Sequence, residues 1–189
     1  GHAAKPHETI DPTVIASQIV VALQTIASRR ADPVEQVVVS ITSFETSSTA
    51  FNVIPQEVKI KGTVRTLDPD VRDLAEKEFL RITELTAEAM GGSADAKFTR
   101  GYPVMSNSSE QTEFAAKVAR DVAGECAEAP LVMGGEDFAY MLEERPGAYI
   151  LLGNGDSSPV HHPKYNFNDD AIPFGCSWLV ELVEQKMPA

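Results

Sequence analysis

The order of two hydrophobic periodicities in the first hundred residues constrains the fold of this chain most strongly. Apolar residues recur at helical spacing over residues 12–29 and again over residues 69–90, and an Asp-Pro pair opens each stretch. Between them, residues 37–41 and 51–67 alternate apolar and polar side chains, as half-buried strands do. The order helix, strand, strand, helix predicts a small sheet with two helices on one face.

The segments that follow predict a second part of different character. Residues 96–102 alternate again, so one strand before the first helix would complete a ferredoxin-like βαββαβ unit over residues 1–104. Beyond residue 105 we expect a helix over 109–123, a strand covered on both faces over 148–152, and a last helix that begins at Asp169 or Asp170. The predicted class is α/β, with the second part, 105–189, resembling the end of an α/β layer.

Composition excludes some classes of partner. The chain has 16 basic and 28 acidic residues among 189, a net charge of −12, which argues against nucleic acid and against anionic membranes because both require a basic face. No apolar run approaches the ~20 residues that a membrane span requires. The two cysteines have no CxxC spacing, which favours reduced thiols in the cytoplasm.

The histidines alone do not define a metal site. They stand in two places, His2 with His7 and His161 with His162, whereas a zinc site needs three or four ligands. Two distant cysteines and scattered carboxylates form no cluster with ligand spacing. The chain also has no GxSxG, HExxH or phosphate-binding glycine motif. Spacing alone therefore leaves the function of this α/β chain open.

Four segments together resemble one enzyme family. In chain order they read GHAAKPH followed by IDP, NVIP followed by GTVR, MGGEDF, and VHHPKYNFND. These segments are similar to those of the hippurate hydrolase family of N-acyl-amino-acid amidohydrolases, which includes plant auxin-conjugate hydrolases. One departure is Asn166, which stands where aspartate is common. The match is specific because the four motifs occur in the right order over the whole chain.

This resemblance implies an architecture and an activity. Such enzymes have a catalytic domain with two divalent metal ions (zinc, manganese or cobalt) and an inserted lid domain that forms a homodimer. Residues 1–104 would be the lid, and residues 105–189 the C-terminal part of the catalytic domain. The expected reaction is hydrolysis of the amide bond of a small N-acyl amino acid. Two metals can bridge a water and lower its pKa, which creates a nucleophile at neutral pH.

The resemblance also assigns two histidines. His161 matches the last metal ligand, while the other ligands and the general-base glutamate match no residue of this chain. His2 matches a lid histidine that reaches into the partner subunit's active site. There it can donate a hydrogen bond to the oxyanion, and losing one such donor typically costs about 2.7–4 kcal/mol of barrier.

Four further residues are candidates for substrate binding, each with a structural alternative. Asn52 could donate to the substrate or could cap a turn before Pro55. Gly134 and Gly135 offer backbone N–H groups to a carboxylate at a helix start, or form a tight turn. Glu136 could hold a neighbouring group, or could be an acid favoured by the helix dipole.

The sequence leaves two other functions open. The chain, lacking the other ligands, could serve as a non-catalytic dimerisation or interaction module. Within the enzyme class, the alternative is a related metallo-carboxypeptidase or desuccinylase on the same architecture.

Overall fold

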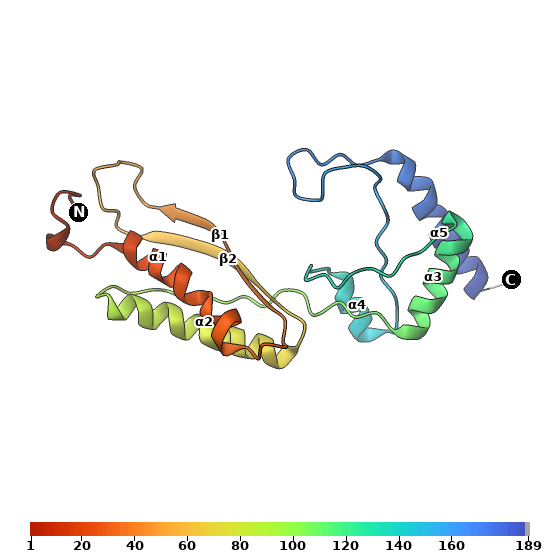
Figure 1. Cartoon of the computed structure of the whole chain (residues 1–189), viewed down its shortest axis with the longest axis horizontal. Helices are drawn as coiled ribbons and strands as arrows, with labels where there is room; N and C mark the ends of the chain where they lie inside the picture. The colour runs from red at the N-terminus through yellow and green to blue at the C-terminus, as the bar shows by residue number, and fades with distance from the viewer. Residues whose placement is uncertain (188–189) are drawn as a thin grey trace. The chain divides into compact units, whose positions relative to one another are not determined.

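The computed structural model describes residues 1–187, which form two compact units that divide between Val104 and Met105 (Figure 1). The first unit contains helices α1 (Pro12–Leu23) and α2 (Pro69–Ala89) and strands β1 (Val37–Thr46) and β2 (Val58–Thr66). The second contains α3 (Ser109–Ala123), α4 (Phe138–Glu144) and α5 (Ile172–Lys186). Each unit is described by itself below.

Local capping signals set the starts of both helices in the first unit. The carboxylate of Asp11 accepts the N–H of Thr13, and Asp68 caps α2 in the same way, with a proline following each cap. The predicted helix over 12–29 is divided: α1 ends at Leu23, and a π-helical turn, Ile26–Arg30, follows it. Both helices begin where the sequence predicted.

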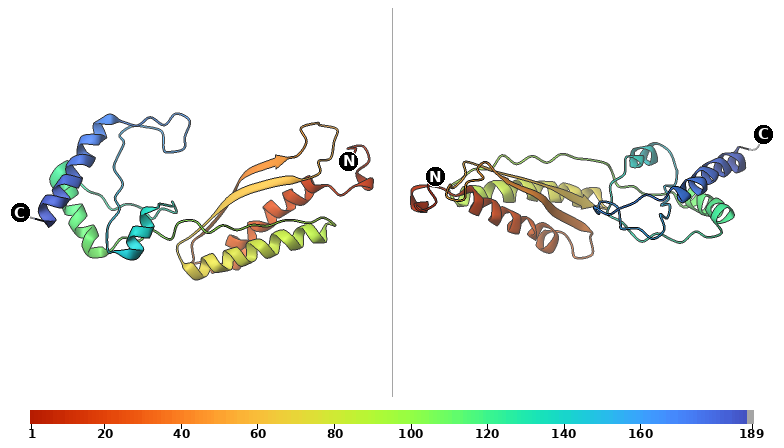
Figure 2. Two further views of the ribbon diagram at one scale, coloured as in Figure 1. Left: turned by 180° about the vertical axis from the view of Figure 1, so that it is seen from behind. Right: turned by 90° about the horizontal axis from the view of Figure 1, so that it is seen from above.

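The two strands pair antiparallel and carry the core on one face. Their register places Val39 opposite Val64, with an irregularity between Ile41 and Ser43. α1 and α2 run side by side against this strand pair (Figure 1; Figure 2, left). The buried centre combines residues of α1, the π-helical turn and α2 with the apolar face of the strands: Ile15, Ile19, Leu23, Ile26, Ala75, Ile82 and Ala87, packed by Val37, Val39, Ile41, Ile60 and Val64.

A buried carboxylate ties α2 to the π-helical turn. Glu78 is 8% exposed, and its Oε2 accepts a hydrogen bond of 2.7 Å from Arg81 and lies 3.1 Å from Nε of Arg30. The hydrogen bond from Arg81, with the positive charges of both arginines, holds the pKa of Glu78 below its ordinary value. Burial acts against this shift but does not cancel it.

The predicted strand over residues 96–102 is wrong. The segment is extended and keeps its alternation: Ala94 packs against the core, and the ring of Phe98 meets that of Phe79 at 5.8 Å. Arg100 binds Asp73 and Glu76 of α2. A strand, however, exists through hydrogen bonds to a neighbouring strand, and no described segment lies in position to supply them. Side-chain packing and the ion pairs of Arg100 hold this segment on α2.

The second unit is helical where it is regular. α3 spans the predicted residues 109–123 and ends at Gly124, whose φ of +83° suits glycine. A 3₁₀ turn, Asp169–Ala171, leads into α5, and Nε1 of Trp178 on α5 donates to the carbonyl oxygen of Ala115 on α3 at 3.1 Å.

The predicted strand over residues 148–152 is also wrong. No strand occurs among residues 105–187, and Leu151 and Leu152 are 65% and 49% exposed. The side chain of Asn107 takes the place of a partner strand, because it donates to the carbonyl of Tyr149 and accepts its N–H. A strand covered on both faces requires neighbours that these residues do not provide.

Over residues 1–187 the observed class is mixed α/β with one two-stranded sheet. The first unit shows the α, β, β, α part of the predicted order, and the strand predicted to follow α2 is not formed. None of the helices in residues 1–187 combines the length and apolarity that crossing a membrane requires.

Candidate functional site

The structure brings the N-terminal segment against the loop that joins β1 and β2. The N–H of Ala3 donates to the carbonyl of Asn52 at 3.1 Å, and the N–H of Ile54 donates to the carbonyl of Gly1 at 2.8 Å. These two bonds form an isolated antiparallel bridge in which His2 is directly opposite Val53. The predicted site residues His2 and Asn52 therefore lie on adjoining segments, because Ala3, next to His2, bonds to Asn52 while His2 itself is opposite Val53.

The loop that carries Asn52 is itself closed by hydrogen bonds. The hydroxyl oxygen of Ser47 accepts the N–H groups of Gln56 and Glu57, and the N–H of Val53 donates to the carbonyl of Ala50. The side-chain amide of Asn52 makes no hydrogen bond to any described residue, so it caps no turn here. This leaves the amide accessible to a ligand, as the sequence prediction requires.

The imidazole of His2 is exposed and is held by a neighbouring amide. The N–H of Ala4 points at Nδ1 of His2 at a distance of 3.1 Å. An N–H donor requires a lone pair on Nδ1, so the proton of the neutral ring is on Nε2. If the ring were turned over, Cδ2–H would face the amide hydrogen instead. His2 is thus arranged as a donor through Nε2.

His161 stands out by its backbone. Its φ is +69°, which makes it the one non-glycine residue with positive φ within residues 1–187. Such a conformation costs of order 1–3 kcal/mol and occurs preferentially at functional sites. The loop around it is closed at its base, because the side chain of Asn154 donates to the carbonyl of Asn166 and accepts the N–H of Asn168, both at 2.7 Å.

His162 is arranged like His2. Its Nδ1 accepts the N–H of Lys164 at 3.1 Å, which places the proton of the neutral ring on Nε2. A metal bond through Nε2 would require moving that proton to Nδ1, where it would meet the amide hydrogen. His161 makes no such contact within the described residues. The local geometry therefore favours His161 over His162 as a ligand.

The glycine pair stands before a short helix. α4 begins at Phe138 and has only seven residues, so Gly134 and Gly135 precede its first turn. Neither has a positive φ, so the alternative of a tight turn that demands glycine is not supported either. Both glycines are exposed. Gly134 and Gly135 thus stand before α4, and their binding of a substrate carboxylate stays a prediction.

Glu136 is half-buried beside Tyr149, a neighbour that the sequence did not predict. Burial raises the pKa of the Tyr149 phenol above its ordinary value, and the negative charge of Glu136 raises it further. The ring of Tyr149 also lies 5.7 Å from that of Phe138. Glu136 thus acts on Tyr149, which is fixed in turn by Asn107.

The described residues do not form a metal site by themselves. Residues 1–187 contain no group of three or more histidine, cysteine, aspartate or glutamate side chains that could hold an ion. His161 is therefore at most one ligand of a site completed by residues outside this set. The two free cysteines, Cys126 and Cys176, contribute to no cluster either.

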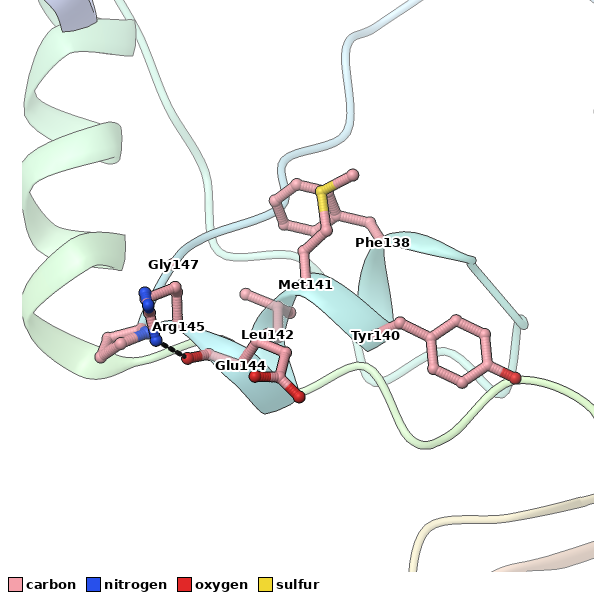
Figure 3. A pocket seen from close by; sticks show the side chains of 8 residues that line it. Phe138, Tyr140, Met141, Leu142, Glu144, Arg145 and Gly147 are labelled. Atoms are coloured by element: carbon pink, nitrogen blue, oxygen red, sulfur yellow. Dashed lines mark hydrogen bonds between the residues drawn. The ribbon is translucent and has the colours of Figure 1, made fainter.

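An apolar hollow of about 540 Å³ lies beside α4 (Figure 3). Eight residues between Phe138 and Gly147 line it, including Met141, Leu142 and Pro146. It contains neither Glu136 nor His161. Its only polar interaction drawn in Figure 3 is the bond from Arg145 to the carbonyl of Glu144. The hollow thus contains none of the predicted site residues, and the candidate site rests on the histidine-bearing loops.

The comparison with known proteins identifies the family. The sequence profile of peptidase family M20/M25/M40 matches residues 5–185. The chain belongs to this family, which confirms the resemblance seen in the four motifs.

Individual relatives are similar over nearly the whole chain. N-acetyl-L-cysteine deacetylase of Bacillus subtilis is 36% identical over 184 residues, covering 97% of this chain and 44% of its own length. Hippurate hydrolase of Campylobacter jejuni is 36% identical over 188 residues, covering 96% of this chain and 48% of its own length. A crystal structure of a dinuclear metal-binding M20 peptidase from Bacillus subtilis matches with a TM-score of 0.69 and 29% identity. The match covers 94% of this chain and 47% of that protein. The chain thus spans about half the length of these relatives.

Proposed function

We propose that this chain is part of an enzyme that hydrolyses the amide bond of N-acyl amino acids and binds two divalent metal ions, zinc, manganese or cobalt. The observation that carries the proposal is the similarity of nearly the whole chain to an N-acetyl-L-cysteine deacetylase and a hippurate hydrolase. A small N-acylated amino acid is the substrate.

His2 stabilises the charge that develops on the amide oxygen. As the carbonyl carbon becomes tetrahedral, its oxygen becomes negative, and a fixed donor lowers the free energy of that state more than that of the substrate. The bond from Ala4 to Nδ1 supports this role, because it directs Nε2–H outward. Asn52, whose amide is free within the described residues, supplies a second hydrogen bond to the substrate.

His161 is the one metal ligand that this chain contributes. Its strained, left-handed backbone and its position on a closed loop support this assignment. Gly134, Gly135 and Glu136 bind the substrate on the same unit, with exposed backbone N–H groups available to its carboxylate.

The first unit serves as the lid and the surface of a homodimer. In this proposal its ferredoxin-like βαββαβ sheet is completed by a strand outside the chain. Exposed apolar residues on α1, including Val14 and Val21, and the unpaired edge of β1 support a two-fold contact there. A cytoplasmic location rests on the two free thiols.

A substrate panel tests the proposal. The full-length enzyme is assayed with N-acetyl and N-benzoyl amino acids, N-succinyl amino acids and free dipeptides, before and after chelation. We expect hydrolysis of the N-acetyl and N-benzoyl amino acids, loss of this activity on chelation, and its recovery when a divalent ion is added. Preferential cleavage of dipeptides or N-succinyl amino acids would favour a carboxypeptidase or desuccinylase. No cleavage of any substrate with metal restored would favour a non-catalytic module.

A further inference from the structure

The bridge between the N-terminal segment and the β1–β2 loop places an apolar side chain beside His2. In an antiparallel pair, directly opposed residues share a face, whereas their sequence neighbours point to the other face. The bridge pairs His2 with Val53, and its two hydrogen bonds flank this pair rather than joining it. In that kind of pair the Cα atoms are about 4.5 Å apart. Val53, and not Asn52, therefore adjoins the imidazole.

Val53 remains available for contact. Its side chain is 43% exposed and takes no part in the core of the first unit, which α1, α2 and the strands form. Residues 47–56, which surround it, contain no charged side chain. On the side of the β1–β2 loop, the donor Nε2–H of His2 is thus bordered by neutral and apolar surface, which suits an apolar group and disfavours an ionised one.

An N-acyl amino acid has two substituents on its amide carbonyl carbon. One is the amino acid, which carries a carboxylate, and the other is the acyl group, which in acetyl or benzoyl substrates is apolar. When His2 donates to the carbonyl oxygen, the surface next to the donor meets one of these two substituents. The apolar surface of Val53 matches the acyl group.

We propose that Val53 is a specificity-determining residue whose side chain contacts the acyl group while His2 donates to the carbonyl oxygen. This inference rests on the proposed hydrolysis of N-acyl amino acids and adds to it a residue that selects the acyl group. A larger apolar acyl group gains more from this contact than an acetyl group does.

The test is the ratio of kcat/KM for N-benzoylglycine over N-acetylglycine in the full-length enzyme. Val53→Ala should lower this ratio of kcat/KM values about three- to tenfold. The change is smaller than the discrimination that one methylene group provides in a closed hydrophobic pocket, because Val53 is partly exposed. Val53→Thr keeps the shape of the side chain and should lower the ratio in the same direction. General damage to the fold would lower kcat/KM equally for both substrates and leave the ratio unchanged.

Val34→Ala is the matched control. Val34 is 82% exposed and precedes β1, so it is separated from the β1–β2 loop by the ten-residue length of that strand. Its substitution should leave the ratio unchanged. An unchanged ratio in both Val53 variants would overturn the inference while leaving the hydrolase proposal intact. Absence of hydrolysis of both substrates by the unsubstituted enzyme would instead overturn the proposed function, and the inference with it.

Discussion

A Cβ atom on Gly62 of β2 would stand 2.3 Å from the carbonyl oxygen of Ser40 on β1. The close approach occurs next to the irregularity in β1, where the register shifts between Ile41 and Ser43. The obstructing atom belongs to the backbone of the paired strand, so it cannot swing aside as a side chain can. The absence of a side chain at residue 62 is thus a condition for this strand pair, which in turn carries the Asn52 loop.

Gly62→Ala should therefore destabilise the first unit. We expect a loss of about 1–3 kcal/mol in the free energy of unfolding, as overpacking typically causes. The same substitution at Gly101, where a Cβ would meet nothing within 4 Å, should be neutral or slightly stabilising. Urea unfolding of the two variants measures the difference, and equal stabilities would contradict the structure at β1–β2.

The ion pairs of Glu78 predict a dependence of stability on pH. Its pKa is lowered in the folded state from the ordinary 4.5, so its contribution is complete above that value and is lost as the pH falls through the lowered pKa. Glu78→Gln should cost about 1–2 kcal/mol at neutral pH, a modest value because Arg30 and Arg81 are 49% and 41% exposed. The variant should also lose less stability on acidification than the original chain.

Glu84→Gln, on the exposed side of the same helix, is the control for Glu78→Gln and should change neither quantity appreciably. Thermal unfolding followed from neutral to acid pH provides both measurements. If Glu78→Gln and Glu84→Gln had the same pH profile, the buried ion pairs would not stabilise the unit.

The phenol of Tyr149 should titrate later than an ordinary tyrosine. Burial and the charge of Glu136 raise its pKa, so the unfolded phenol ionises first and folding stability falls as the pH rises above 10.0. Glu136→Gln should lower the midpoint, though not to the ordinary value because burial remains. Alkaline absorbance difference spectra between the chain and Tyr149→Phe isolate this phenol, and Glu143→Gln on α4 is the control. An unchanged titration midpoint of Tyr149 in Glu136→Gln would show that Glu136 does not affect the Tyr149 phenol.

The sequence predicted elements well where the determining interactions are local. Asp11 and Asp68, each before a proline, mark the two helix starts in the first unit, and Gly124 marks the end of α3. These signals act within one or two turns of chain. The alternation over residues 96–102 predicted a strand, and the structure shows an extended segment with one face packed on α2. The strand itself is not formed, because it requires a partner that alternation does not specify.

The candidate site shows the same division. The motifs located His2, Asn52, Glu136 and His161, but no pattern in the sequence indicates that Val53 stands opposite His2. The contact of Tyr149 with Glu136 is equally non-local. At both His2 and His162, the amide two residues further along donates to Nδ1. His7 is followed by such an amide as well, that of Thr9, which donates to Pro6 instead, so the sequence alone does not predict this contact.

The histidine pair in the second unit gives a direct test of ligand identity. His161→Ala in the full-length enzyme should remove one of two bound metal ions and nearly all turnover, with the fold retained. His162→Ala should keep both ions, because its Nδ1 is already used by Lys164. Metal content by plasma emission spectroscopy, together with far-ultraviolet circular dichroism, distinguishes the two. Retention of both ions in His161→Ala and loss in His162→Ala would reverse the assignment.

A donor at the oxyanion should affect catalysis more than binding. His2→Ala should lower kcat by about two to three orders of magnitude while metal content and dimerisation stay unchanged. His7→Ala, in the same exposed N-terminal segment, is the control and should retain activity. If the His2→Ala variant lost stability but kept its kcat, the role of His2 would be structural and not catalytic.

Subunit exchange between two inactive variants tests the central claim, that His2 acts in the active site of the partner subunit. His2→Ala and His161→Ala homodimers are mixed under conditions that exchange subunits, and hydrolysis of an N-acyl amino acid is followed. In each heterodimer one active site combines an intact His161 with an intact His2 from the other subunit, while the second site carries both lesions. Activity should return to at most about half that of the original enzyme per heterodimer. No recovery despite proven exchange would contradict the account.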